Sequence, residues 1–198
     1  MKNLLNYQSS EFDCGPVSIT NAIRFLYERE EIMPSLLKHI WVMGNDTFCD
    51  EGRPGLHGTS KASMHYMAEW MNAFGKGCKF PIAARFLEME QAVIVPDSPA
   101  WQCLARGGCA VIRCTTGGIP HYVLLTGLLP GNEIGLFDPY EEEPDFSADP
   151  ACRVVDDEPR RMNRAVRAAR VNSDGDDDYA MGAPEKREIL LIWRSDRT

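Results

Sequence analysis

The stretch Gln8-Ser-Ser-Glu-Phe-Asp-Cys-Gly15, followed directly by Pro16, marks the start of the first predicted helix. Proline suits the first turn of a helix, where the N–H that it lacks would have no intrahelical partner. Apolar residues then recur at the spacing i, i+3, i+4, i+7, and they are Ile19, Ala22, Ile23 and Leu26. This spacing predicts an amphipathic helix from about residue 16 to about residue 30. The sequence therefore places Cys14 where a helix begins.

A cysteine at a helix start differs chemically from a cysteine in a core. The N–H groups and the partial positive charge of a helix N-terminus stabilise a thiolate. Gln8 precedes Cys14 by six residues, and its side-chain amide can donate a hydrogen bond beside the sulfur. A nucleophile with an adjacent donor is what acyl-transfer chemistry requires. The alternative role for Cys14 is structural, because a free cysteine is among the most buried residue types.

His121 and Asp138 are the residues expected to activate such a thiol. His121 opens an apolar, β-forming segment after a glycine-rich turn, and Asp138 ends the next predicted strand. Antiparallel neighbours joined by a short turn bring the start of one strand beside the end of the next, so we expect the two side chains at one rim of a sheet. An aspartate there can fix the imidazole tautomer and stabilise the imidazolium. The structural alternatives are a hydrogen-bonded strand-end histidine and a turn-forming Asp-Pro pair.

Cys49, His57 and His65 are the other combination of residue types that could bind a metal ion. Zinc sites usually show tighter, paired ligand spacings than these three positions offer. We therefore expect no metal site and no cofactor.

The order of the predicted elements, helices first and strands later, indicates an α+β chain in which N-terminal helices pack on an antiparallel sheet. Further helices are predicted at about 34–44, 60–75 and 99–107, with the methionines of the 60–75 helix in the core. Strands are predicted at 109–114, 121–127, 133–137 and 188–193. Residues 86–95 are interpreted as a helix passing into a strand, residues 160–170 as a helix, and residues 44–59 and 172–178 as loops.

Composition limits the class of protein. The 198 residues, of which 44% are hydrophobic and 25% charged, suffice for a single domain, 1–198, with a sizeable core. The formal net charge of −8 argues against nonspecific binding to nucleic acid or to an anionic membrane. Residues 141–178 supply −6 of this charge, and we expect an acidic loop insertion there before a closing strand at 188–194. An acidic docking surface is the less favoured interpretation of this segment.

The seven cysteines stand at positions 14, 49, 78, 103, 109, 114 and 152. Their odd number and the absence of a Cys-x-x-Cys pair favour reduced thiols in the cytoplasm over a disulfide framework. The N-terminal residues show no signal-peptide pattern, and the longest apolar runs are too short for a membrane span. A cytoplasmic protein is therefore expected, and its oligomeric state is not predicted.

The candidate residues also occur in the order found in one family of enzymes. Gln8 with Asp13-Cys14-Gly15-Pro16, then His121-Tyr-Val-Leu-Leu-Thr-Gly127, then Asp138-Pro139 resemble the bacteriocin-processing double-glycine peptidases and their stand-alone relatives over roughly residues 5–140. The resemblance implies a papain-like cysteine peptidase fold. It also implies that Cys14 is the nucleophile, that His121 is the general base and acid, that Asp138 orients His121, and that Gln8 donates a hydrogen bond in the oxyanion hole.

The reaction implied by this resemblance is cleavage of a peptide or related amide bond through a thioacyl-enzyme, with a peptide or small amide as the partner. Leader-processing members are usually fused to a membrane transporter with an ATPase domain. No such domain is expected in this chain, so leader cleavage is not carried over. The loop at 44–59 and the segment 141–178 are not explained by the core of the family. Two alternatives remain, namely an acyltransferase that uses the same cysteine and histidine and a binding relative without catalysis.

Overall fold

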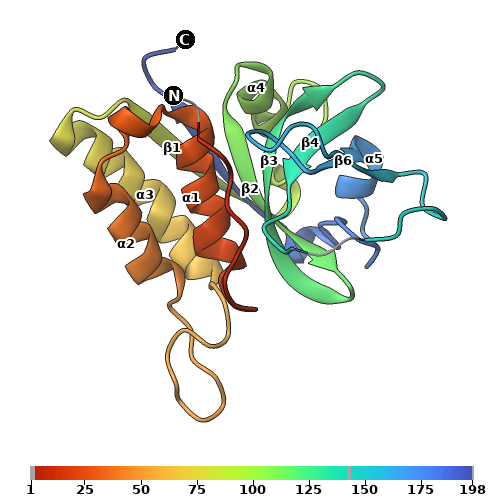
Figure 1. The fold of residues 1–198 in the computed structure, drawn as a ribbon, viewed down its shortest axis with the longest axis horizontal. Coiled ribbons are helices and arrows are strands. Elements are labelled where there is room, and N and C mark those ends of the chain that lie inside the picture. The colour runs from red at the N-terminus through yellow and green to blue at the C-terminus, as the bar shows by residue number, and fades with distance from the viewer. Residues whose placement is uncertain (1–2, 142–143, 198) are drawn as a thin grey trace.

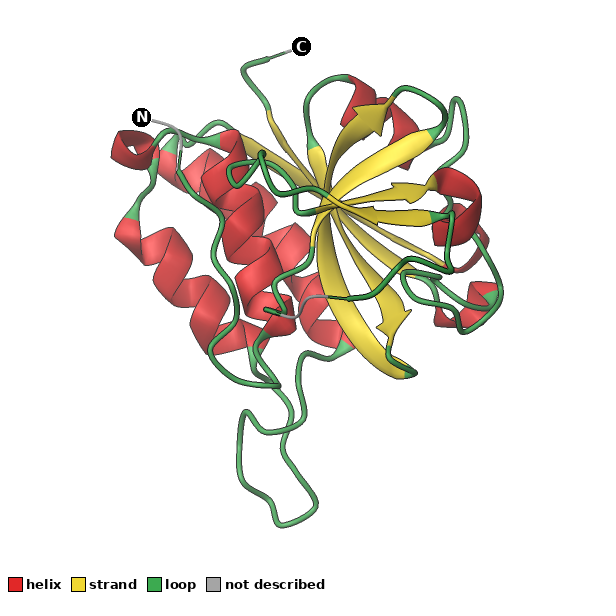
Figure 2. Ribbon diagram, turned by 45° about the vertical axis from the view of Figure 1, so that its right-hand side comes forward, coloured by secondary structure: helices red, strands yellow, loops and turns green. Residues whose placement is uncertain are grey.

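Helices form one flank of the molecule and a twisted sheet forms the other (Figures 1 and 2). A computed structural model of the chain describes residues 3–141 and 144–197. In Figure 1 the three long helices lie side by side, and the strands fan out beside them. The long loop after the second helix projects from the lower end of the molecule.

The helical flank consists of α1 (Cys14–Leu26), α2 (Pro34–Gly44) and α3 (Lys61–Cys78). Helix α1 starts two residues earlier than predicted, at Cys14 itself. Helix α3 begins after Ser60, whose side chain accepts a hydrogen bond from the backbone N–H of Ser63. Such a cap satisfies one of the N–H groups that a helix start leaves free. None of the helices in residues 3–141 and 144–197 is long and apolar enough to cross a bilayer.

Within the described residues, seven strands form one sheet in which each neighbouring pair is antiparallel. They are β1 (Ile82–Glu88), β2 (Cys109–Thr116), β3 (Ile119–Leu129), β4 (Glu133–Phe137), β5 (Cys152–Val154), β6 (Arg164–Arg167) and β7 (Glu188–Arg194). Their spatial order is β1-β7-β2-β3-β4-β6-β5. The expected α+β class, with N-terminal helices on an antiparallel sheet, is therefore confirmed. Strands β2, β3 and β4 form a meander within this sheet.

The last strand in the sequence occupies an interior position in this sheet. Ile189 of β7 pairs with Leu87 of β1 on one side and with Ile112 of β2 on the other. The run from Ile189 to Ile192 is buried throughout. A strand covered on both faces is expected to be apolar without alternation, and this segment has that composition.

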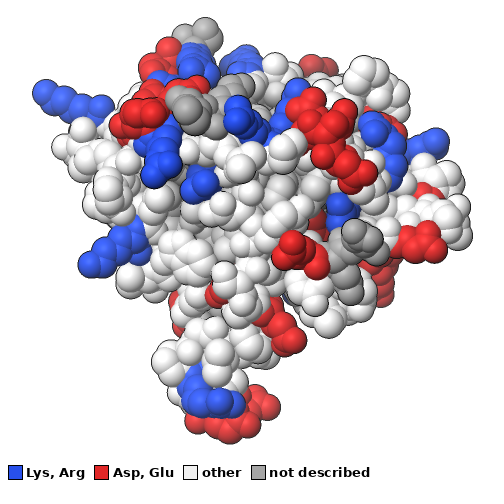
Figure 3. Space-filling view, viewed as in Figure 1, with Lys and Arg blue, Asp and Glu red and all other residues white. Residues whose placement is uncertain are grey.

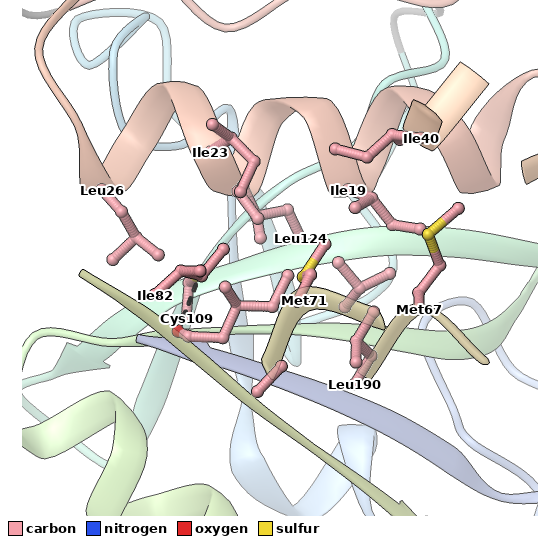
Figure 4. Close-up of a cluster of buried hydrophobic side chains, with 14 of the residues drawn as sticks. Ile19, Ile23, Leu26, Ile40, Met67, Met71, Ile82, Cys109, Leu124 and Leu190 are labelled. Atoms are coloured by element: carbon pink, nitrogen blue, oxygen red, sulfur yellow. Dashed lines mark hydrogen bonds between the residues drawn. The ribbon is translucent and has the colours of Figure 1, made fainter. Parts of the chain in front are cut away.

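Two hydrophobic clusters lie on opposite faces of the sheet. One lies between α1–α3 and the sheet, and Figure 4 shows Ile19 and Ile23 of α1 above Leu124 and Leu190 of the strands. The predicted methionine stripe of α3 belongs to this cluster, since Met64, Met67 and Met71 are buried. The other cluster lies under α4 (Pro99–Ala105) and α5 (Ala168–Val171). Each fully buried large side chain contributes about 1.5–3 kcal/mol, so both clusters stabilise the sheet.

Two helix predictions are wrong. Residues 86–95, expected to be a helix passing into a strand, instead contain the end of β1 (Ile82–Glu88) and a short 3-10 turn at Met89–Gln91. Residues 160–170, also predicted as a helix, contain β6 and the four-residue helix α5. In both places pairing with a neighbouring strand, β7 for the first and β4 for the second, outweighs the local helix preference.

The segment 141–178 is more than a loop insertion. It contributes β5, β6 and α5, and β6 extends the sheet beyond β4. Residues 142 and 143 of this segment lie outside the described residues. The acidic composition therefore accompanies a structured extension of the fold.

Four asparagines connect separate segments in the same way. Each side chain donates from Nδ2 to the carbonyl of one distant residue and accepts at Oδ1 from the N–H of that same residue. The pairs are Asn21 with Asn6, Asn72 with Ala84, Asn163 with Asp138, and Asn172 with Ile94. Buried or edge backbone groups require such partners. The first and third pairs fix segments that carry candidate site residues.

Candidate active site

Cys14 is the first residue of α1 and is 8% exposed. The backbone of Asp13 forms the N-cap, and no side chain caps this helix end. The first N–H groups of the helix therefore remain available near the sulfur, and their partial positive charge favours an anion there. Cys14 thus occupies the environment expected for a nucleophilic thiol.

His121 of β3 pairs with Asp138, which follows β4. Its Nε2 lies 2.7 Å from Asp138 Oδ1, and its side chain is 12% exposed. The short turn between the two strands brings these residues to one rim, as the sequence predicted. Burial lowers the pKa of His121, but hydrogen bonds to Asp138 and to Cys14 outweigh this effect and raise the pKa to about 10. Since Asp138 occupies Nε2, Nδ1 is the nitrogen left to interact with Cys14.

Three groups besides His121 fix the position of Asp138, which is 3% exposed. The phenol of Tyr179 donates a hydrogen bond to Oδ2 at 3.0 Å, and the backbone N–H of Tyr140 donates to Oδ1 at 2.9 Å. Asn163 bonds both the N–H and the carbonyl of Asp138, each at 2.8 Å. Buried polar groups require hydrogen-bond partners, and these contacts supply them. Asp138 is therefore fixed in both its backbone and its side chain.

A buried hydrogen bond away from the candidate triad also links the cysteine helix to the histidine strand. The hydroxyl of Ser18, one turn after Cys14, donates to the carbonyl of Tyr122 at 3.0 Å. Ser18 is fully buried, and Tyr122 directly follows His121. This contact helps to fix the position of α1 relative to β3, and thereby the distance between the Cys14 thiol and the His121 imidazole.

Gln8 lies beside the same rim. Its backbone N–H donates to the carbonyl of Pro139 at 2.8 Å, which holds the N-terminal segment next to Asp138. Its Nε2 donates to the carbonyl of Ser10 at 2.9 Å, and its buried Oε1 has no partner within residues 3–141 and 144–197. An amide nitrogen carries two hydrogens, so one remains for a ligand.

Gly15 touches the end of the long loop between α2 and α3. A Cβ on Gly15 would lie 2.7 Å from the Cβ of Thr59 and closer still to its hydroxyl. Thr59 donates to the carbonyl of Gly44, so the two ends of the loop are joined beside Cys14. The expected loop at 44–59 is therefore present and adjoins the candidate nucleophile.

The tip of this loop projects away from the rest of the molecule (Figure 1). Phe48 forms an isolated bridge with Pro54 and is 68% exposed. Acidic and basic side chains lie together at the tip (Figure 3), where Arg53 pairs with Glu51. The loop is thus anchored near the candidate site and free at its far end.

Two residues that support the site were not predicted. Asn163 lies in the stretch 160–170 that was predicted as a helix, and Tyr179 directly follows the predicted loop at 172–178. Both reach Asp138 through tertiary contacts. The backbone of Tyr179 has a φ of 65°, which is uncommon for a bulky residue. It is held there because its N–H donates to the carbonyl of Thr115 at 2.7 Å. No local sequence pattern marks this role.

His65 and Cys49, two members of the combination that was weighed as a metal site, have separate contacts. His65 stacks on Phe86, and the thiol of Cys49 donates to Glu51. Within residues 3–141 and 144–197 there is no group of three or more histidine, cysteine, aspartate or glutamate residues arranged to hold a metal ion. Cys14, His121 and Asp138 therefore form the leading candidate site.

Comparison with known proteins gives limited similarity. No family model and no curated protein matches the chain. The solved structure of the peptidase domain of ComA from Streptococcus mutans is similar with a TM-score of 0.41 and 13% identity, over 96% of this chain and 98% of that domain. We therefore base the functional proposal on the residues of this chain and their contacts.

Proposed function

We propose that the chain is a papain-like cysteine peptidase, or a hydrolase of a closely related amide bond. The observation that carries the proposal is the line of contacts from Cys14 at a helix start, through the imidazole of His121, to the buried carboxylate of Asp138. A nucleophile, a base and a group that orients the base are the parts that thiol acyl transfer needs. The proposal takes residues 1–198 as one catalytic domain, because β7 joins β1 to β2.

In the proposed reaction His121 takes the proton of the Cys14 thiol, and the sulfur attacks the carbonyl carbon of the scissile amide. The C=O electron pair moves onto the oxygen, and collapse of this intermediate breaks the C–N bond. His121 gives its proton to the departing amine, which leaves a thioacyl-enzyme. His121 then takes a proton from water, whose oxygen attacks the carbonyl carbon of the thioester. The C–S bond breaks, the acid leaves, and His121 returns the proton to the sulfur of Cys14. Asp138 keeps the imidazole oriented and stabilises its charged form.

Two donors are proposed to stabilise the negative oxygen in the first step. One is the backbone N–H of Cys14, which belongs to the free N–H groups of the first turn of α1. The other is the second N–H of Gln8, whose first N–H is held by Ser10. A donor aimed at the oxyanion typically contributes a factor of about 10²–10³ to kcat.

The experiment that tests the proposal is alkylation by iodoacetamide, mapped to each of the seven cysteines at a pH of about 5–6. An ordinary thiol titrates near a pKa of about 8.5 and reacts slowly there. We expect Cys14 to react much faster than the exposed Cys78, which serves as an internal reference. His121→Ala should remove the difference. A Cys14 that reacts no faster than Cys78 in the wild-type protein would overturn the proposal.

Turnover is tested with a mixed peptide library followed by mass spectrometry. The wild-type chain should produce cleaved peptides, and Cys14→Ala should produce none while keeping its circular dichroism spectrum. Adding a primary amine distinguishes hydrolysis from acyl transfer, since both pass through the same thioacyl-enzyme. Release of acid without the amine supports the hydrolase; products formed only with the amine would contradict it.

A further inference from the structure

A cavity lies far from the candidate active site, between β1, the end of β7 and α4. Its volume is about 310 Å³. Residues from three elements and the C-terminal segment line it, namely Arg85, Pro99, Gln102, Cys103, Arg106, Gly107, Gly108, Leu191, Trp193, Arg194 and Arg197. In Figure 1 this is the upper end of the molecule, where α4 lies, opposite the long loop. The chemistry proposed above does not use this end.

Strand β2 separates the cavity from the candidate active site. Gly108 and Cys109 lie at its cavity end, whereas Cys114 pairs with His121 near its other end. At about 3.3 Å per residue, the five steps from Cys109 to Cys114 span roughly 16 Å. A small ligand in the cavity therefore has no contact with the candidate site.

The cavity is cationic in an acidic protein. Four of its eleven lining residues are arginines and none is acidic, whereas lysine and arginine together make up 21 of the 198 residues. The arginines come from β1, from the residue after α4, and from the end of β7 and beyond. Their convergence is therefore a property of the fold rather than of composition or of one sequence segment.

One of these arginines is already engaged. Arg194 is 9% exposed, bonds Glu31 and Asp196 through its guanidinium, and lies over the ring of Tyr27. Neither Glu31 nor Asp196 lines the cavity. Arg194 therefore forms part of the cavity wall, and Glu31 and Asp196, which lie outside the cavity lining, compensate its charge.

Arg85 and Arg106 have no such partner. Both are exposed, and neither forms an ion pair with any residue in 3–141 or 144–197. Guanidinium groups match phosphate oxygens with two parallel hydrogen bonds and are weakly hydrated, so two of them at one cavity favour a phosphate over water. These two side chains, together with the exposed Arg197 of the C-terminal segment, are the cationic donors available to a ligand.

The remaining lining provides an apolar surface below the arginines. Trp193 is half-buried and packs against the hydrophobic cluster on that face, as does the buried Leu191. Burial raises the pKa of the nearby Cys103 to about 12, so this thiol is not a nucleophile. An anionic group and a flat or apolar portion can therefore be accommodated together.

We propose that this cavity binds a small phosphate ester of mononucleotide size, with the phosphate between Arg85 and Arg106 and the rest of the molecule against Trp193. The volume is at the lower end of the range of about 300–1,000 Å³ typical of small-molecule sites, which fits one nucleotide rather than a dinucleotide. This site is independent of the proposed peptidase activity.

Isothermal titration calorimetry on the full chain tests this proposal with AMP, ribose 5-phosphate, inorganic phosphate and adenosine. AMP is expected to bind more tightly than inorganic phosphate and to weaken as salt is raised, because exposed charges are screened. Adenosine, without the phosphate, is expected not to bind. Equal affinity for AMP and ribose 5-phosphate assigns the site to sugar phosphates within the same class; higher affinity for AMP assigns it to nucleotides.

The variant Arg85→Gln/Arg106→Gln should lower the affinity for AMP by at least about tenfold. Arg160→Gln/Arg167→Gln, two exposed arginines elsewhere, is the matched control and should bind as the wild type. Arg106→Gln alone provides a second variant if the double variant fails to fold. Cys14→Ala should bind AMP normally, which separates this result from the peptidase test. Absence of binding to every phosphate probe, or unchanged affinity in the double variant, would overturn the proposal.

Discussion

Position 15 requires glycine because Thr59 lies against it, not because of its backbone conformation. Alanine at position 15 would improve helix propensity, but its Cβ would collide with Thr59. We expect Gly15→Ala to lower the free energy of unfolding by about 1–3 kcal/mol, the usual cost of overpacking. Gly77 in α3 is the control, because nothing lies within 4 Å of a Cβ built there. Gly77→Ala should raise stability by up to about 1 kcal/mol in urea unfolding; the same sign for both variants would contradict this explanation.

Tyr179 is expected to position Asp138 rather than to touch substrate. Tyr179→Phe removes a hydrogen bond to a buried carboxylate, which is worth about 1.5–3 kcal/mol. If the transition state loses this stabilisation and the bound substrate does not, kcat falls by about ten- to a hundredfold while KM changes little. The pH profile should shift as well, because Asp138 sustains the pKa of His121.

The control for Tyr179 is Tyr66→Phe, which removes a phenol bonded to the remote His39. Both kcat and the pH profile of this variant should match the wild type. If Tyr179→Phe keeps the wild-type kcat and pH profile, Tyr179 contributes only to packing and does not position Asp138.

The raised pKa of His121 predicts how the free energy of unfolding depends on pH. Burial lowers this pKa, but the bonds to Asp138 and Cys14 raise it to about 10, against 6.5 in the unfolded chain. The folded state therefore binds this proton more tightly, and the contribution is complete below a pH of about 6.5 and lost as the pH rises through about 10. Under reducing conditions, the gap in unfolding free energy between wild type and His121→Ala should shrink between pH 6 and pH 10. A gap that stays constant or widens would show that His121 gains no proton affinity on folding.

At the scale of elements, the site depends on how α1 is set against β3. Ser18→Ala removes the hydrogen bond to the Tyr122 carbonyl and leaves that buried acceptor without this partner. We expect a loss of about 1–3 kcal/mol in unfolding free energy. Because thiol and imidazole lie on these two elements, the alkylation rate of Cys14 should also fall. Ser63→Ala, at the start of α3, is a useful comparison, since it also removes a helix-borne hydroxyl bond, to the Met43 carbonyl, without involving β3. Equal alkylation rates in the two variants would contradict this role of Ser18.

The elements that were misassigned show where local pattern fails. Residues 164–167 have the arginine-rich composition of a helix, yet Val166 and Ala165 are buried because β6 pairs with both β4 and β5. The residues at 188–194 were assigned correctly, since an apolar run of this length with β-branched residues is typical of an interior strand. Strand pairing joins residues far apart in the sequence, so a short window does not contain the partner that decides the outcome.

At the scale of the whole molecule, the chain closes its sheet with its last strand. Removing residues 188–198 would leave both β1 and β2 without their shared neighbour and expose two hydrophobic clusters. We expect this truncation to abolish cooperative thermal unfolding. Replacing the loop tip at residues 48–54 with a short Gly-Ser link should leave unfolding nearly unchanged, because the tip contributes only an isolated bridge and its own turn bonds. A cooperative transition in the truncated chain would show that β7 is dispensable.

The sequence by itself determined the helix start at Cys14, the α+β class, and the approach of His121 to Asp138, because cap residues, periodicity and short turns act within windows of a few residues. Only the tertiary structure decided that Tyr179 and Asn163 hold Asp138, that Thr59 excludes a side chain at position 15, and that arginines from separate segments meet at one cavity. These contacts join residues many positions apart. Their partners are set by the packing of helices on the sheet, which no local pattern specifies.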